Sequence, residues 1–323
     1  MGTHPLVREQ RVRRTGSRDR RALIATLGTG VDELGAHVSS AGGVVNAPGR
    51  AAELDSVVLQ LFTKQASRWA EREVTPEQAA AFREQRVRHG IRTISSHDSY
   101  LINLASPDPA LLERSLESFR AELRRCIALG IDYLVMHPGN ATDRDRDRGL
   151  EQNAAAIERA LRIEGGETMV LLEHTADTGT ALGSTFEELR RIIDAIAATE
   201  RERVGVCLDT CHLWAAGYDI VTDYEGVMDR LDAIVGLDRV RLFHLNDSKT
   251  GLGSARDRHE HIGAGSIGAQ GFRSLLGDAR FAAVPKLLET PKDDDALAAD
   301  RRNLAVLRSL RSSGKQVAEA RNF

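Results

Sequence analysis

Asp209 and His212 stand three residues apart, directly after an apolar run at 204–208. Val204, Val206 and Leu208 alternate with smaller residues in that run, which predicts a β-strand with the acidic residue at its tip. A turn at the tip separates the two side chains, so that they can serve neighbouring metal ions. The same spacing is also typical of a structural Asp that caps the next segment and bonds the His, so this pair alone leaves both interpretations open.

Similar polar residues follow seven of the eight apolar runs that we interpret as strands. The runs lie at 34–38, 56–62, 92–96, 133–136, 169–172, 204–208, 240–243 and 284–288. At or after their ends come His37, His97 with Asp98, His137, Glu173 with His174, Asp209 with His212, His244 and Glu289, and a later loop adds Asp257, His259 and His261. A single His at a strand end is usually structural, but so many independent ones are not expected by chance. Imidazoles and carboxylates without thiolate pairs favour zinc, manganese or iron.

Helical patterns separate nearly all of these runs. A capping box at Thr75 begins one helix, which Gly90 ends, and Asp108 begins another, which Gly130 ends. We expect further helices from a second capping box at 184–187 and over 294–310.

Eight strand–helix units predict a single-domain (β/α)8 TIM barrel from residue 34 to about residue 310. In such a barrel the chemistry lies at the carboxyl ends of the strands, where the polar residues stand. An open doubly wound sheet is the alternative, but no Gly-x-Gly-x-x-Gly sequence follows an early strand.

Composition and charge restrict the class of protein. No apolar run of the 323 residues approaches the roughly 20 needed to span a bilayer, and no signal peptide is evident, so a cytoplasmic location is expected. We interpret all three cysteines, Cys126, Cys207 and Cys211, as packing residues. Residues 1–33 carry seven arginines and a balance of +3, and we expect them to form a basic, poorly ordered extension. With a total of −3, the rest of the chain carries −6, which disfavours a polyanion unless bound cations offset it.

Ordered motifs along nearly the whole chain from residue 34 resemble those of the endonuclease IV family of apurinic/apyrimidinic endonucleases. They include Gly35-Ala-His-Val-Ser-Ser-Ala-Gly-Gly43, Leu61-Phe-Thr-Lys64, His97-Asp-Ser-Tyr-Leu-Ile-Asn-Leu104, His137-Pro-Gly139, Val206-Cys-Leu-Asp-Thr-Cys-His212, His244-Leu-Asn-Asp-Ser-Lys249, Asp257-Arg-His259 and Glu289-Thr290. The resemblance implies a TIM-barrel domain over 34–323 that binds three zinc ions. It also implies cleavage of double-stranded DNA on the 5′ side of abasic sites in base excision repair, which leaves a 3′-hydroxyl.

The family's nine zinc ligands fall on residues of suitable chemistry in this sequence. They are His97, His137, Glu173, Asp209, His212, His244, Asp257, His259 and Glu289. Three zinc ions with four carboxylates leave a charge of about +2, which offsets the acidic body. We expect Glu173 to bridge two ions that share a hydroxide and Glu289 to orient the nucleophile, with manganese an option at some positions. We expect a monomer.

DNA contacts are also implied by the resemblance. Tyr100 and Leu101 match the wedge residues that fill the gap beside an extruded nucleotide, while Lys64, Arg68 and Lys249 are candidate phosphate or groove contacts.

Three positions depart from the family pattern. Ser67 stands where an Arg is usual, with Arg68 displaced by one, His174 replaces an Asn after Glu173, and Ala264 replaces a Glu. None of these removes a predicted ligand, but the first puts the lesion preference in doubt.

Two alternatives stay open at this point. Sugar isomerases and epimerases of the xylose-isomerase type share the barrel, although they need only one or two metal ions. A non-catalytic binder of damaged DNA is the other, because of the altered Arg position.

Overall fold

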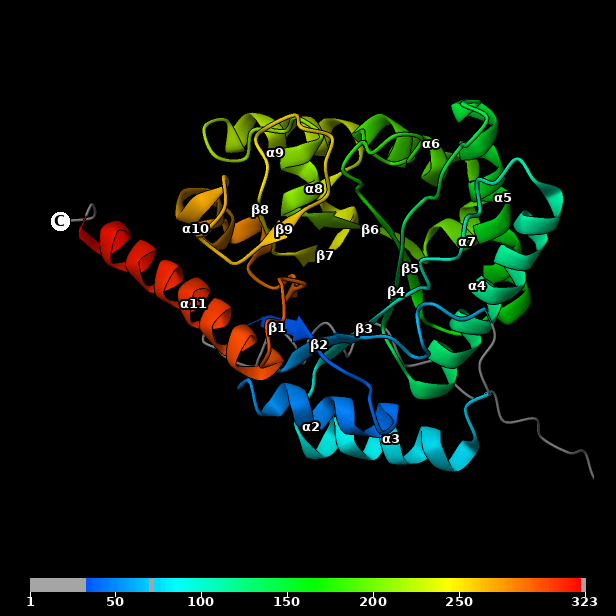
Figure 1. Ribbon diagram of the computed structural model, residues 1–323, viewed down its shortest axis with the longest axis horizontal. Coiled ribbons are helices and arrows are strands. Elements are labelled where there is room, and N and C mark those ends of the chain that lie inside the picture. The colour runs from blue at the N-terminus through cyan, green and yellow to red at the C-terminus, as the bar shows by residue number, and fades with distance from the viewer. Residues whose placement is uncertain (1–32, 70–72, 321–323) are drawn as a thin grey trace, which may run out of the picture. The chain divides into compact units, whose positions relative to one another are not determined.

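Eight parallel strands close into a barrel (Figure 1). They are β1 (Leu34–His37), β2 (Val58–Leu61), β3 (Thr93–His97), β4 (Tyr133–Met136), β5 (Met169–Glu173), β6 (Val204–Asp209), β7 (Val240–His244) and β10 (Lys286–Leu288). Each strand pairs with the next in chain order, and β10 closes on β1 with Leu34 opposite Lys286. The predicted (β/α)8 TIM barrel is therefore confirmed.

This computed structural model describes residues 33–69 and 73–320, without the side chains of 312–320. Residues Glu33–Phe323 form one compact unit. The predicted poor order of the N-terminal extension lies outside the described residues, apart from Glu33.

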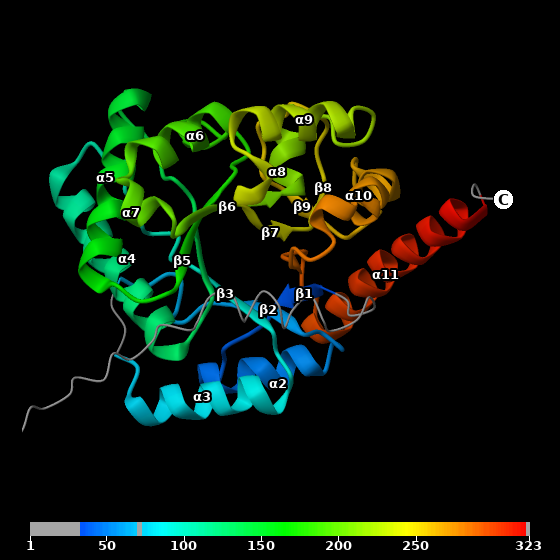
Figure 2. The same cartoon turned by 180° about the vertical axis from the view of Figure 1, so that it is seen from behind.

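Helices surround the strands on all sides in the two opposite views (Figure 1, Figure 2). The α-helices are α2 (Ala47–Ala52), α3 (Pro76–Arg88), α4 (Pro109–Leu129), α5 (Arg146–Glu164), α6 (Phe186–Ala195), α7 (Ala198–Arg201), α8 (Thr210–Ala215), α9 (Tyr224–Ile234), α10 (Gly268–Gly277) and α11 (Ala296–Ala320). Short 3-10 turns lie at Val44–Asn46, Leu237–Arg239 and Ala279–Phe281. No described helix combines the length and apolar character that crossing a membrane requires.

Helix ends follow the local sequence signals, with two corrections. The last helix, predicted over 294–310, is α11 (Ala296–Ala320) and extends ten residues further. Thr75 forms the predicted capping box, Asp108 caps α4, and Gly130 ends α4 with a φ of 72°. The cap of α6 is Thr185 rather than Ser184, and its side chain accepts from the backbone N–H of Glu188. Ser184 instead donates to Asp177, so the prediction of a box beginning at 184 was wrong by one residue.

The barrel interior is packed with apolar side chains directly beneath the polar rim. Val58, Val135, Leu171, Cys207, Leu242 and Leu287 form this inner cluster. All of them except Val58 lie two residues before a predicted ligand, and because strand side chains alternate, the ligand also points inward. Gly35 occupies the equivalent place in β1. A Cβ there would lie 2.1 Å from the carbonyl oxygen of Val58, so only glycine allows β2 to pack so closely.

A short antiparallel ribbon stands above the barrel between β7 and α10. It consists of β8 (Asp247–Ser248) and β9 (His259–Glu260). Asp247 fixes the chain after the ribbon, because its carboxylate accepts from the backbone N–H groups of Gly263, Gly265 and Ile267. The ribbon therefore holds residues 257–259 against the carboxyl end of the barrel.

Candidate metal centre

The nine predicted ligands come together at the carboxyl ends of the strands. They form three contiguous groups with ligand atoms within 4.8 Å of one another, namely His97, His137 and Glu173; His212, Asp257 and His259; and Glu173, Asp209, His244 and Glu289. Each of these groups offers imidazole nitrogen and carboxylate oxygen without a thiolate. Their assignment as ligands remains a prediction, but their assembly is a feature of the fold.

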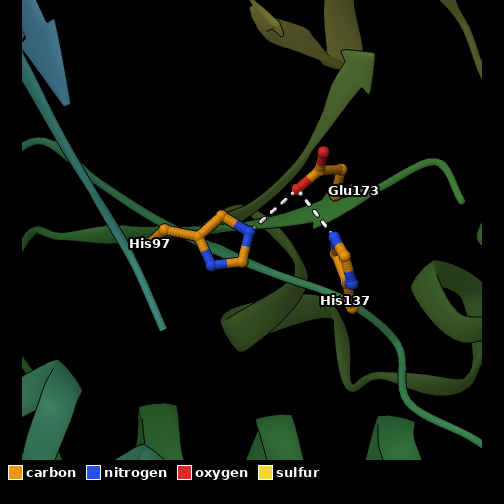
Figure 3. A group of neighbouring side chains, drawn as sticks. All are labelled: His97, His137 and Glu173. Atoms are coloured by element: carbon orange, nitrogen blue, oxygen red, sulfur yellow. Dashed lines mark hydrogen bonds and ion pairs between the residues drawn. The ribbon is translucent and has the colours of Figure 1, made fainter. Parts of the chain in front are cut away.

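Glu173 lies at the centre of the three groups and has no exposed surface. Its Oε2 atom lies 3.0 Å from His97 Nε2 and 3.3 Å from His137 Nε2 (Figure 3). Its Oε1 atom lies 2.9 Å from His244 Nδ1 and 3.4 Å from His212 Nδ1. One carboxylate at the end of β5 therefore contacts imidazoles from four other segments.

The group containing Asp257 joins the ribbon to the barrel. Asp257 Oδ2 lies 3.2 Å from His212 Nε2, and Oδ1 lies 3.1 Å from His259 Nε2. His212 belongs to α8, which begins directly at the tip of β6. Asp209 Oδ1 accepts from the backbone N–H of His212, so this Asp caps α8 as the structural interpretation of the pair predicts.

Glu289 and His244 form the third side of the centre. Glu289 Oε2 lies 3.2 Å from His244 Nδ1, and its other oxygen accepts a hydrogen bond from the amide of Gln60. The Glu289 side chain retains 19% exposure, whereas that of Glu173 retains 1%. Of the two glutamates, Glu289 is thus the one that reaches solvent.

Oxygen acceptors fix the protonated nitrogen of four histidines. His97 Nδ1, His212 Nδ1 and His259 Nδ1 lie 2.8–3.1 Å from backbone carbonyl oxygens. His244 Nε2 lies 2.9 Å from the amide oxygen of Gln60. Because these oxygens can only accept, each of those nitrogens carries the proton. In the neutral ring, the form that binds a cation, the other nitrogen then offers a lone pair.

The carboxylates strongly favour a positive charge at this place. Burial would lower the pKa of His97, but Glu173 outweighs it and raises the pKa to about 9. Burial is likewise outweighed at His244, where Glu289 and Glu173 raise the pKa to about 10. The pKa of Glu173 lies well below its usual range despite burial, because His244 and His137 stabilise the ionised form.

The donor set fits divalent cations. Ligand atoms bound tetrahedrally at 2.0–2.2 Å lie about 3.3–3.6 Å apart, and the observed contacts of 2.9–3.3 Å are comparable. His259 Nε2 is buried and, among the described residues, finds no hydrogen bond of adequate geometry although Asp257 is near. A cation between opposed lone pairs satisfies both partners, so these residues fit zinc or a similar ion.

Cys207 and Cys211 lie near the centre, and the Sγ atom of Cys211 lies within 4.8 Å of candidate ligand atoms of Asp209 and His259. Cys207 packs in the inner barrel cluster, and Cys211 is fully buried. Burial and Asp209 raise the pKa of Cys211 to about 12, which keeps the thiol protonated, although it lies close to Asp209 and His259. Cys126 lies in the core on α4. All three behave as the packing residues that the sequence predicts.

Two polar residues of the centre escaped the sequence analysis. Gln60 in β2 is fully buried and bridges Glu289 and His244. Asn246 donates to Asp209 Oδ2 at 2.6 Å, and its amide oxygen accepts from the backbone N–H of Glu289. The sequence does contain a signal for Gln60. It is an amide within a buried strand, and it lies two residues after Val58, so its side chain points into the barrel as that of Val58 does.

Four of the predicted DNA-contact residues are accessible at the rim. Tyr100 is 72% exposed and its ring lies 5.6 Å from that of Phe62, while Leu101 beside it is partly exposed. Arg68 and Lys249 are exposed.

Lys64 is placed differently from the prediction. It is 6% exposed, and its ammonium lies 3.3 Å from Glu122 Oε1 beneath the surface. A direct phosphate contact by Lys64 is therefore not supported by its position.

The three departures from the family pattern lie outside the contacts among the ligands. Ser67 and Ala264 are exposed. His174 is fully buried between the rings of Phe186 and Tyr218, and burial lowers its pKa to about 3. Its backbone oxygen, not its side chain, orients His212.

Comparison with known proteins agrees with this geometry. Residues 49–310 match the family model described as xylose isomerase-like TIM barrel. A protein of Chloroflexus aurantiacus named probable endonuclease 4 is 50% identical over 282 residues, which cover 86% of this chain and 97% of that protein. A protein of the same name from Geobacter sulfurreducens is 46% identical and covers 86% and 94%.

Solved structures give the same result. The crystal structure of endonuclease IV from Thermus thermophilus superposes with a TM-score of 0.77 at 37% identity, covering 87% of this chain and 99% of that one. A D-tagatose 3-epimerase-like protein also superposes, with a TM-score of 0.62, but at 18% identity that likeness shows the fold alone. On these relatives and on the residues assembled at the rim, the chain belongs to the endonuclease IV family within the xylose isomerase-like TIM barrel proteins.

Proposed function

We propose that this protein is a zinc-dependent DNA-repair endonuclease that hydrolyses the phosphodiester on the 5′ side of abasic sites in double-stranded DNA and leaves a 3′-hydroxyl. The observation that carries the proposal is the gathering of nine imidazole and carboxylate side chains into three groups around Glu173. The names of the relatives support the same activity, since they are described as endonucleases.

Three cations are the number that the grouping supports. His97, His137 and Glu173 would hold one ion, His212, Asp257 and His259 a second, and Asp209, His244 and Glu289 with Glu173 a third. When bound, such ions supply Lewis acids for phosphodiester oxygens and make a water nucleophile available near neutral pH. Zinc suits the nitrogen-rich groups, and manganese suits the carboxylate-rich one.

Glu173 and Glu289 take different parts in this proposal. Glu173 is sealed from solvent and contacts imidazoles through both oxygens, which suits a carboxylate shared between ions. Glu289 keeps access to solvent while Gln60 holds one of its oxygens. A carboxylate that is both fixed and accessible is suited to orient a nucleophile and accept its proton.

The rim supplies the means to recognise a lesion. The ring of Tyr100 lies 6.2 Å from that of His97, and Tyr100 with the partly exposed Leu101 would fill the gap left by an extruded abasic nucleotide. Arg68 and Lys249 can meet the phosphate backbone, since both are exposed. The acidic body of the protein would repel DNA elsewhere, which favours contact at the cation-loaded rim.

Cleavage of a duplex with one defined abasic site tests the proposal. The zinc-loaded protein should cut that strand once and leave a 3′-hydroxyl that a polymerase extends, whereas the intact duplex should survive. Metal analysis should give about three ions per chain, since a sugar isomerase would hold one or two. Binding without cleavage would instead identify a non-catalytic binder of damaged DNA. We also propose that the protein is cytoplasmic and acts as a monomer. Gel filtration of the zinc-loaded protein with abasic DNA tests the monomer, which should form a 1:1 complex.

A further inference from the structure

The segment Thr63–Trp69, here called the β2 loop, has an exposed upper side and a buried underside. Ser67 and Arg68 are exposed, whereas Thr63 and Lys64 are 3% and 6% exposed. Arg68, a candidate DNA contact, is thus exposed, whereas polar residues of the same loop are buried beneath it. These buried groups are not used by the proposed chemistry.

One face of α4 holds that underside. Arg114, Ser118, Glu122 and Arg125, here called the α4 polar stripe, are spaced four, four and three residues apart and therefore share a helix face. Three of them are nearly buried, with exposures of 5%, 1% and 7% for Ser118, Glu122 and Arg125. All four contact the β2 loop.

Contacts of the stripe cover both ends of the loop. Glu122 accepts from the Thr63 hydroxyl at 2.7 Å and lies 3.3 Å from the ammonium of Lys64. Arg125 donates to the backbone oxygen and the hydroxyl of Thr63. At the other end, the Arg114 guanidinium lies 4.3 Å from the centre of the Trp69 ring, and the Ser118 hydroxyl donates to the Trp69 backbone oxygen at 3.2 Å.

Lys64 transmits this anchoring to the DNA-contact position. Its ammonium donates to the backbone oxygen of Arg68 at 2.5 Å while it faces Glu122. The neighbouring segment is tied in as well, because the Ser99 hydroxyl donates to the backbone oxygen of Ala66. Arg68 and Tyr100 therefore stand on two loops that share one hydrogen-bonded base.

We infer that the α4 polar stripe, through the Lys64–Glu122 pair, is a positioning device that holds the β2 loop in its DNA-binding conformation. Lys64 is then a positioning residue and not a phosphate contact. Buried charges are costly compared with apolar residues of the same size, so packing alone gives no reason for them. Unlike apolar contacts, these polar groups orient the loop, because each donor or acceptor fixes a particular backbone oxygen or hydroxyl of it.

Kinetics with the zinc-loaded enzyme test this inference, which rests on the proposed function. Glu122→Gln keeps the size of the side chain but removes its charge, and Lys64→Met removes the ammonium. Each should raise KM for abasic-site DNA about tenfold, as expected when a positioned contact is displaced, with kcat changed less than twofold. The double variant should be no worse than the poorer single variant, because both changes break one link.

Salt dependence separates positioning from phosphate contact. Each phosphate contact contributes about −0.9 to the slope of log affinity against log salt concentration. Lys64→Met and Glu122→Gln should change the slope of log kcat/KM by the same amount, since both displace the Arg68 contact, whereas Lys249→Met, an exposed lysine, should reduce it by nearly one contact of its own. A reduced slope in Lys64→Met together with an unchanged KM in Glu122→Gln would overturn the inference.

A matched control addresses general damage to α4. Glu164, the last residue of α5, accepts hydrogen bonds from Arg120 and Arg124 of α4. These two arginines are not among the residues of α4 that contact the β2 loop. Glu164→Gln should therefore leave KM unchanged, and an equal KM rise in this variant would overturn the inference. If the buried variants fold poorly, Ser118→Ala, which removes one hydroxyl, supplies a milder test with the same expected direction.

Limited trypsin digestion provides a readout independent of DNA. Cleavage after Arg68 should be faster in Glu122→Gln and Lys64→Met than in wild type, because the exposed loop loses its anchor. Unchanged digestion would contradict the inference even if cleavage kinetics changed. If the wild type fails to cleave abasic DNA, the proposed function fails, while digestion still decides the role of the stripe.

Discussion

The amide nitrogen of Gln60 donates to the Glu289 carboxylate, although the two residues lie 229 positions apart in the chain. The same amide accepts from His244 through its oxygen, so one uncharged side chain fixes an acid and an imidazole at once. Because a carboxylate can only accept, it also determines which end of the amide faces which partner. Gln60 is therefore part of the candidate metal centre without belonging to the predicted ligands.

Replacing Gln60 by Leu should weaken zinc binding by about 10- to 100-fold, the range typical of residues that orient metal ligands. Glu289 and His244 would keep their places but lose their fixed orientation. Competition with a chelator measures the affinity. Ser95→Ala is the control, since it removes only a hydroxyl that donates to Gln60 from behind, and its affinity should stay within a few-fold of wild type.

Glu289→Gln should preserve the fold and reduce cleavage of abasic DNA by about 100-fold or more, because the amide can neither accept a proton nor hold its charge. Single-turnover cleavage at saturating zinc measures the effect. Glu117→Gln on the exposed side of α4 makes the same chemical change far from the rim and should cleave normally. Turnover of Glu289→Gln near that of wild type would refute the assignment.

Removal of metal should lower the melting temperature and abolish cleavage. Ligands at a hundredfold excess over Kd add about 2.7 kcal/mol of stability, which corresponds to a shift of about 5 °C or more. The carboxylates that face one another around Glu173 lose their counter-charge in the apoprotein. Differential scanning fluorimetry with chelator, followed by zinc or magnesium, tests this. Magnesium should restore neither property, since the donor set is rich in nitrogen.

Truncation of Tyr100 or Leu101 to Ala should weaken binding of abasic DNA about tenfold without a change in melting temperature. A stacked aromatic side chain contributes about 1–3 kcal/mol per base, and Tyr100 is largely exposed in the free protein. Val87→Ala removes a comparably exposed side chain near the carboxyl end of α3, on the opposite side of the barrel from the rim. Equal loss in that control would argue against a wedge.

Gly35→Ala should destabilise the barrel by about 1–3 kcal/mol or more, because the added methyl group meets the backbone of β2. Urea unfolding measures the change. Gly251→Ala offers the matched control, since a Cβ at Gly251 meets nothing within 4 Å. A midpoint equal to that of wild type would show that β1 and β2 can separate without cost.

The sequence predicts the barrel, and the gathering of the candidate ligands at its rim, because both depend on local patterns. Alternation within 204–208 predicts the strand, and strand parity then determines that Asp209 points inward with Cys207 beneath it. Glu289 and His97 follow from the same rule.

Side chains whose partners come from distant segments were harder to predict. Lys64 follows a strand tip like the ligands do, and only the packing of α4 places Glu122 beneath it. Gln60 and Asn246 are uncharged amides, whose importance depends on which carboxylate lies nearby. The cap of α6 at Thr185 differs from the prediction by one residue, because Ser184 is engaged by Asp177.

Closure of the barrel by β10 also sets the order in which the centre can mature. His97 is the earliest of the nine donors in the chain and Glu289 is the last, following the strand that pairs with β1. During synthesis the amino-terminal part emerges first, so a nascent chain can offer the pair His97 and His137 with Glu173 well before the other sites exist. In the proposed three-ion enzyme, full ion uptake would therefore wait until translation has passed residue 289, so that metallation would be a late step that reports on completed folding.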